Sequence, residues 1–167
     1  VKEVIKDNNG TAQASDWTLT ASGPTGFSGI GPTVSSGPSF EAGTYNLSES
    51  GGPSGYSPSS WSCQGGTQDG DKITLNLGES ATCTITNDDN APALHLRKTV
   101  TNDNGGSALD TAWTLTATGT SGSPTNLSGT TPVDSGSDFK ADTYALAEVS
   151  GPSGYTASAW SCDGGTM

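Results

Sequence analysis

The sequence predicts an all-β protein built from two tandem β-sandwich domains. Two observations carry this prediction: the chain repeats itself once, and each repeat consists of short runs rich in Thr, Val, Tyr and Trp. Such residues are enriched in β-strands, and Gly, Pro, Asn and Asp turns separate the runs. No stretch shows the apolar period of an amphipathic helix. Several short strands per repeat are typical of a β-sandwich.

The repeat defines the domain boundaries. Three pairs of segments match: residues 16–21 with 112–117, 45–56 with 144–155, and 61–66 with 160–165. The second copy is longer in the loop between Gly119 and Phe139. Surface loops are the places where insertions of this kind are best tolerated. We therefore predict one sandwich over residues 1–90, and a linker plus a second sandwich over residues 91–167.

Both copies are expected to be incomplete. Aligning Lys98 with Lys2 leaves the first repeat without the start of its opening strand. The second repeat stops at Met167, before the counterparts of residues 73–77 and 82–87. The strands that we expect are 1–6, 16–22, 32–35, 44–49, 55–62, 72–77 and 81–87 in the first repeat, and an opening strand at 94–100 in the second.

Composition limits the core and the classes of partner. Only 30% of residues are hydrophobic, and the chain has 24 Gly and 9 Pro. Small cores of this kind usually need covalent or other staples. The net charge of -11 with only 6 Lys and Arg argues against binding to nucleic acid. No run is long and apolar enough to predict a transmembrane helix.

Three polar side chains point toward the predicted core of the first repeat. Because side chains alternate along a strand, Glu49 shares a face with Tyr45 and Leu47. By the same alternation Lys2 and Asn87 face inward from the first and last strands. A buried charge without a partner is costly, so these three residues are expected to meet.

The pattern Tyr-x-Leu-x-Glu followed by Pro-x-Gly-Tyr, at residues 45–56 and again at 144–155, resembles a known family. It is similar to the SpaA-like, or collagen-adhesin B-type, prealbumin-fold domains of bacterial surface proteins and pili. The resemblance covers both repeats and implies a prealbumin-like, reverse immunoglobulin-like sandwich. The Asp- and Asn-rich loop at residues 7–10 and the Trp-Ser-Cys segment depart from the common pattern.

The resemblance also implies a spontaneous isopeptide bond between a lysine and an asparagine, assisted by a buried glutamate. The matching cross-link residues are Lys2 and Asn87, with Glu49 as the catalytic carboxyl group. In the second repeat Lys98 and Glu148 match, and the asparagine is expected beyond Met167. A neutral buried amine can attack a carboxamide, and a protonated carboxyl group can polarise it and shuttle a proton. The alternative is an ion pair of Lys2 with Glu49, with Asn87 ending its strand.

The cysteines of the first repeat predict a disulfide. Cys63 and Cys83 face inward and lack the spacing of a metal site, so pairing is favoured over two buried thiols. Cys162 aligns with Cys63 and is expected to be unpaired in this chain.

Enzymatic turnover has little support in the sequence. His95 is the only histidine and lies on an outward face, so a Ser–His–Asp site cannot repeat. The Asp/Asn-rich turns at 7–9, 88–90 and 102–104 offer oxygen ligands for calcium, but plain turns are favoured, and no metal or cofactor is predicted. The four tryptophans recur at equivalent places, which favours a core position.

We therefore expect structural repeat domains of an extracellular protein, on a bacterial cell surface or in a secreted fibre. They would form a stalk stapled by isopeptide and disulfide bonds, with neighbouring repeats as partners. One alternative is an adhesin domain that binds a host or surface ligand directly. Another is a self-assembling filament in which a chain lends a strand to its neighbour.

Overall fold

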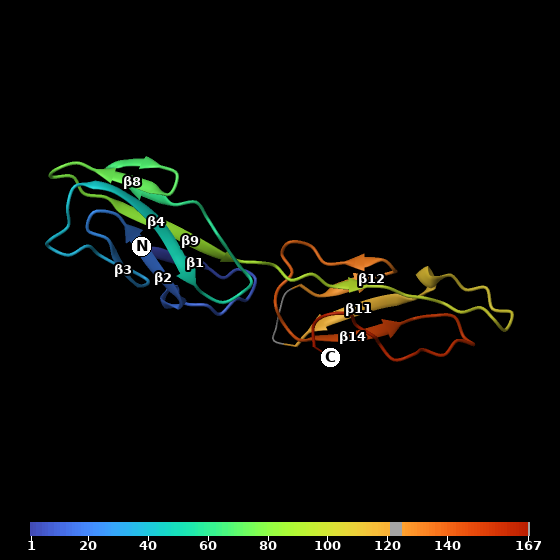
Figure 1. The fold of residues 1–167 in the computed structure, drawn as a ribbon. Helices are drawn as coiled ribbons and strands as arrows, with labels where there is room; N and C mark the ends of the chain where they lie inside the picture. The colour runs from blue at the N-terminus through green and yellow to red at the C-terminus, as the bar shows by residue number, and fades with distance from the viewer. Residues whose placement is uncertain (121–124, 167) are drawn as a thin grey trace. The chain divides into compact units, whose positions relative to one another are not determined.

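The chain folds into two units, residues 1–90 and 91–167 (Figure 1). The computed structural model describes residues 1–120 and 125–166. Both units are all-β as predicted, and the described helical turns are two short 3-10 segments, η1 (Ala14–Asp16) and η2 (Asp110–Ala112). No described helix has the length and apolar character needed to span a membrane. The expected insertion after Gly119 falls partly on residues 121–124, outside the described residues.

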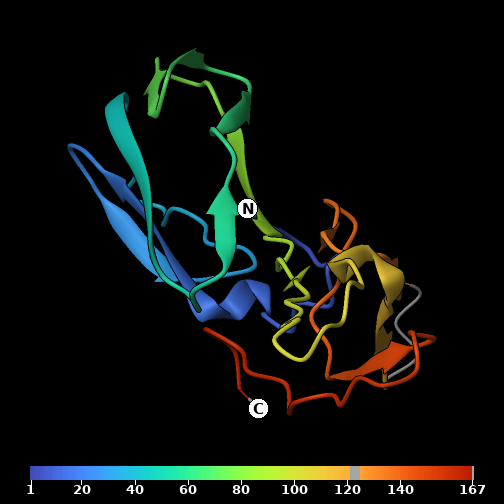
Figure 2. The same ribbon diagram turned by 90° about the vertical axis from the view of Figure 1, so that its right-hand side faces the viewer.

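Unit 1 is a sandwich of two sheets. One sheet has the order β3-β2-β4-β8-β7, and the other has the order β1-β9-β5 with β6 also paired to β9. Figure 2 shows β2 and β4, in blue and teal, on one side of the unit, and β5 and β9, in green, on the other. The bounds are β1 (Lys2–Ile5), β2 (Trp17–Ser22), β3 (Phe27–Ile30), β4 (Gly43–Gly51), β5 (Tyr56–Pro58), β6 (Ser62–Gln64), β7 (Thr67–Asp69), β8 (Lys72–Leu75) and β9 (Thr82–Asp89).

The first and last strands of unit 1 lie side by side. β1 runs parallel to β9, with Lys2 opposite Ile85 and Val4 opposite Asn87. The other strand pairs of the unit are antiparallel. The two ends of unit 1 are therefore held together by neighbouring strands.

Alternation along the central strands builds the core of unit 1. On β4, Tyr45 and Leu47 are buried between exposed Thr, Asn and Ser residues, and Tyr45 is only 1% exposed. Full burial of one such side chain stabilises the fold by about 1.5–3 kcal/mol. The buried cluster consists of Ala21, Tyr45, Leu47, Ile73 and Leu75. Trp61, a predicted core residue, is only partly buried against this cluster.

Two predicted strands of unit 1 are wrong. The expected strand at 32–35 is irregular, and the third strand is instead β3, which pairs with β2. Its Ser-Gly centre lacks the β-branched residues that would have marked it. The expected strand at 55–62 is divided into β5 and β6 by the irregular residues 59–61.

Unit 2 has two smaller sheets. One has the order β12-β11-β14, and the other pairs β10 with β13. Leu96, Leu115, Ala117 and Val133 form its buried cluster. The bounds are β10 (His95–Leu96), β11 (Thr114–Gly119), β12 (Leu127–Gly129), β13 (Val133–Asp134) and β14 (Tyr144–Val149).

The opening strand of unit 2 is shorter than predicted. A strand was expected over residues 94–100, but only His95 and Leu96 have strand pairing. In unit 1 the matching strand β1 is held along its length by β9. Among the described residues of unit 2, none forms a counterpart of β9, so residues 98–100, which match the start of β1, have no strand to pair with.

The predicted disulfide is confirmed. Cys63 on β6 lies directly opposite Cys83 on β9, with their Cα atoms 4.0 Å apart, and the sulfur atoms are bonded. The bond fixes a short edge strand to the last strand of unit 1. Cys162 is free and exposed.

Loss of this disulfide should destabilise unit 1. Replacement of Cys63 and Cys83 by Ser is expected to lower the free energy of unfolding by about 3 kcal/mol, because the unfolded chain gains loop entropy. Denaturant unfolding of unit 1 measures this, with Cys162→Ser in every variant to prevent dimers through that thiol. Equal stability of the Cys162→Ser variant and of the variant with all three cysteines replaced by Ser would contradict the prediction.

Candidate functional site

The buried lysine of β1 is the centre of the candidate site. Lys2 Nζ donates hydrogen bonds to Glu49 Oε2, at 2.7 Å, and to Asn87 Oδ1. The Lys2 side chain has no exposure to solvent, and that of Glu49 is 13% exposed. Asn87 is 2% exposed. The structure thus brings together the three polar residues expected to face the core.

Strand alternation and register explain how these residues meet. Glu49 follows the buried positions Tyr45 and Leu47 on β4, two residues apart each time. Asn87 follows Ile85 on β9 in the same way, and Ile85 lies opposite Lys2. Lysine is long enough to reach from its own position in β1 to the next inward position on β9. The two strands belong to one sheet, and Glu49 approaches from the other.

A tryptophan completes the surroundings of the lysine. The centre of the Trp17 ring lies 4.5 Å from Lys2 Nζ, and Trp17 is 3% exposed. An indole face attracts an ammonium group and also shields an amine from water. The sequence showed Trp17 and Trp113 at matching places but indicated only a core position, so this contact with the lysine was missed.

Unit 2 repeats most of the arrangement. Lys98 Nζ lies 2.6 Å from Glu148 Oε2, and its distance to the centre of the Trp113 ring is 4.7 Å. The side chains of Lys98 and Glu148 are 16% and 20% exposed, more than their counterparts in unit 1. Among the described residues of unit 2, none stands where Asn87 stands.

Comparison with protein families agrees with this geometry. A family model described as a prealbumin-like fold domain, of the SpaA type, matches residues 1–85 and again residues 89–167. The chain belongs to the SpaA-type family of prealbumin-like fold domains. SpaA-type domains occur in extracellular bacterial surface proteins and pili, where they are structural or adhesive. No curated protein and no solved structure matched the chain.

A second buried carboxylate in this SpaA-type unit was missed at the sequence level. Asp89 is 6% exposed and accepts hydrogen bonds from the backbone N–H groups of Asn8 and Gly10. Partial burial alone would raise the pKa of Asp89, but these N–H groups and Asp7 hold it below the ordinary value. Alternation on β9 places Asp89 two residues after Asn87, and this was the signal that could have found it.

The acidic residues near this loop are the candidate calcium ligands that the sequence offers. Oxygen atoms of Asp7, Asp88 and Asp89 lie within 4.8 Å of one another. The donors to Asp89 come from the backbone of the loop itself. The loop that contains Asn8 and Gly10 is therefore anchored to the last strand, and Asp88 and Asp89 end β9 instead of forming the turn expected at residues 88–90.

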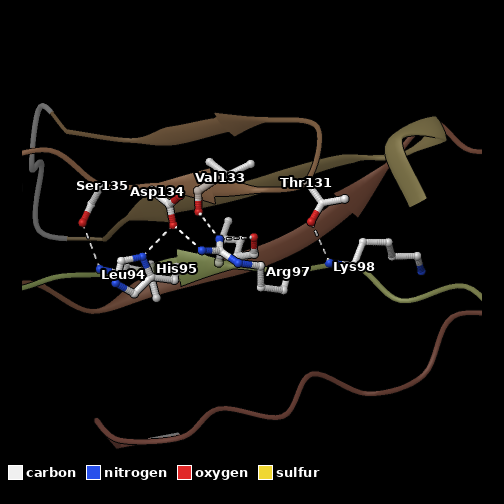
Figure 3. A network of polar contacts seen from close by, with 9 residues as sticks. Leu94, His95, Arg97, Lys98, Thr131, Val133, Asp134 and Ser135 are labelled. Carbon is white, nitrogen blue, oxygen red and sulfur yellow. Dashed lines mark hydrogen bonds and ion pairs between the residues drawn. The ribbon is translucent and has the colours of Figure 1, made fainter. Parts of the chain in front are cut away.

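The only histidine takes part in a surface network of the second SpaA-type unit. His95 Nδ1 and Arg97 both contact Asp134 Oδ1, at 2.6 and 2.7 Å (Figure 3). The hydrogen bonds with His95 and Arg97 lower the pKa of Asp134. All three side chains are about half exposed, and the network fastens β10 to β13.

Acid should remove the stabilisation that Asp89 provides. A carboxyl group with a lowered pKa in the folded state stabilises the fold above its unfolded-state pKa, near 3.9, and loses that effect as the pH falls through the folded-state value. Asp89→Asn is expected to lower the unfolding free energy by about 2 kcal/mol at neutral pH, because hydrogen bonds to a charged group are lost. The substitution should also make the free energy of unfolding fall less steeply below about pH 4.

Denaturant unfolding from pH 7 to pH 2 measures both effects. Asp88→Asn is the matched control, because Asp88 is the exposed neighbour on the same strand. Equal acid sensitivity of wild type and Asp89→Asn would contradict the role given to Asp89.

Proposed function

We propose that the two units are structural repeats of an extracellular bacterial stalk or fibre, and that a covalent bond between Lys2 and Asn87 staples unit 1. The observation that carries the proposal is the fully buried Lys2 amine held between Glu49 and Asn87. Membership of the SpaA-type family supports a surface or pilus role. Neighbouring repeats of the same protein are the expected partners.

The contacts support an amide-forming reaction. Lys2 Nζ donates to Asn87 Oδ1, so the amine lies beside the carboxamide carbon to which that oxygen is bonded. The neutral amine attacks this carbon and forms the Nζ–Cγ bond. The Cγ–Nδ2 bond breaks, and the side-chain nitrogen of Asn87 leaves as ammonia. Folding brings the reactants together, and such proximity is worth about 7–11 kcal/mol of the barrier.

Glu49 is placed to move the proton that this reaction must transfer. Its carboxyl oxygen lies 2.7 Å from the amine, in a site largely closed to solvent. A protonated carboxyl group can donate to the developing oxyanion and then pass a proton to the departing nitrogen. The proton lost by Lys2 Nζ returns to the carboxyl group, so Glu49 ends unchanged. The reaction takes place once in each molecule.

The position of the bond fits a mechanical role. β1 and β9 are the first and last strands of unit 1, and they are neighbours in one sheet. Tension applied to the chain enters the unit at one of these strands and leaves at the other. A bond from Lys2 to Asn87 would carry that tension directly and spare a core of few apolar residues.

Intact mass tests the bond. The wild-type chain, with its disulfide reduced, is expected to be lighter than its sequence mass by one ammonia. The matched variants Glu49→Ala and Lys2→Met should have their full sequence masses, because the former lacks the proton carrier and the latter lacks the nucleophile. Glu148→Ala in unit 2 is the control, and it should keep the ammonia loss.

Peptide mapping then assigns the change. A cyclised Asn-Gly pair would lose the same mass, so the linked peptide must contain Lys2 and Asn87. The full sequence mass in wild type, or an ammonia loss that Glu49→Ala and Lys2→Met both retain, would contradict the covalent staple and leave the ion pair of Lys2 with Glu49.

A further inference from the structure

The Asp- and Asn-rich turns near the start of the two units each contain an Asn-Gly pair. The pairs are Asn9 with Gly10 in unit 1, and Asn104 with Gly105 in unit 2. When the opening lysines of the two units are aligned, Gly105 matches Asn9. The pair of unit 2 therefore lies one position earlier in its turn than the pair of unit 1.

Backbone geometry shows that the two turns have the same form. The backbone is left-handed at Asn9, with φ 69°, and at the matching Gly105, with φ 84°. The glycines that follow, Gly10 and Gly106, each lie against a tyrosine hydroxyl group, because a Cβ atom built on either would clash with that oxygen. One turn shape thus presents the two Asn-Gly pairs in different surroundings.

In unit 1 a buried carboxylate holds the pair. The N–H groups of Asn8 and Gly10, which flank Asn9, both donate to Asp89, and Asp89 is 6% exposed. Hydrogen bonds to an ionised acceptor are stronger than those between neutral groups. Rotation of the peptide between Asn9 and Gly10 would break such a bond, so the Gly10 nitrogen is held away from the Asn9 side chain.

In unit 2 the pair lies in the open part of the turn. Residues 101–107 are all exposed. A Cβ atom built on Gly105 would have no heavy atom within 4 Å apart from its neighbours in the chain. Glycine also has no side chain to hinder approach to its nitrogen, and its backbone rotates more freely than that of other residues. The Gly105 nitrogen can therefore approach the carboxamide of Asn104.

We propose that Asn104 is a site of spontaneous deamidation, whereas the fold protects Asn9. The Gly105 nitrogen loses its proton and attacks Cγ of Asn104. The new N–Cγ bond forms, the Cγ–Nδ2 bond breaks, and the side-chain nitrogen leaves as ammonia, which gives a cyclic imide. Water then opens the imide to aspartate or isoaspartate. Nucleophile and carboxamide belong to adjacent residues, so no encounter between molecules is needed.

A neighbouring carboxylate favours the departure of ammonia. Asn104 Nδ2 donates to Asp103 Oδ1, at 2.9 Å. A carboxylate in this position stabilises the nitrogen as it takes up a proton and leaves.

The loop can accept the modification without loss of its anchor. Tyr155 Oη donates to Asn102 Oδ1, at 2.6 Å, and accepts the Ala108 N–H, at 3.0 Å. These two contacts close the loop on either side of Asn104. Isoaspartate lengthens the backbone by one carbon atom, and either product adds a negative charge, but both changes lie within the exposed loop. Unit 2 therefore keeps its fold while modified molecules accumulate with age.

Ageing of the full folded chain in mildly alkaline buffer tests the proposal. Peptide mapping is expected to find aspartate and isoaspartate at residue 104 at least about tenfold faster than at residue 9, because the Gly10 nitrogen must first leave a charged acceptor. The matched control is the same chain reduced and unfolded in denaturant, where the two pairs should react at similar rates. Asp89→Asn should speed the reaction at Asn9 and leave that at Asn104 unchanged.

Three outcomes would overturn the proposal. One is equal rates at the two asparagines in the folded chain, or no product at Asn104. Another is a difference between the two rates that is as large in denaturant as in the folded chain, since the local sequence and not the fold would then set it. The third is an unchanged rate at Asn9 in the Asp89→Asn variant. A difference seen only in the folded chain and reduced by Asp89→Asn supports the proposal.

Discussion

The structure of unit 1 depends on how it accommodates a lysine side chain that has no exposure to solvent. A buried charge costs several kcal/mol unless it is well paired, and Lys2 is surrounded by Glu49, Asn87 and the ring of Trp17. These partners come from three strands in two sheets, so the lysine fixes the way the sheets face each other. Conversion of the amine to an amide would remove the charge altogether.

The small apolar core explains why a covalent bond between Lys2 and Asn87 would be useful to unit 1. Unit 1 is held by a modest apolar cluster, a disulfide on β9 and a carboxylate, Asp89, that anchors a loop to the same strand. β9 therefore receives the disulfide, the loop anchor and the contact with Lys2. Stabilisation is concentrated at the strand through which tension would leave the unit.

The sequence predicted much of this because the relevant patterns have a period of two. Alternation along β4 and β9 was enough to predict that Glu49 and Asn87 point inward. The matching Trp-Ser-Cys segments revealed the repeat. The strand β3 was missed because its Ser-Gly centre has no strand preference, and the contact of Trp17 with Lys2 was missed because it depends on how the two sheets face each other.

Mechanical unfolding of single molecules tests the central claim most directly. The full chain is pulled from its two ends with the disulfide reduced. The account predicts one lengthening event, from unit 2, because a bond between Lys2 and Asn87 keeps the intervening residues out of the path of tension. Asn87→Ala should add a second event from unit 1. Two events in the wild-type chain would contradict the covalent staple and the mechanical role built on it.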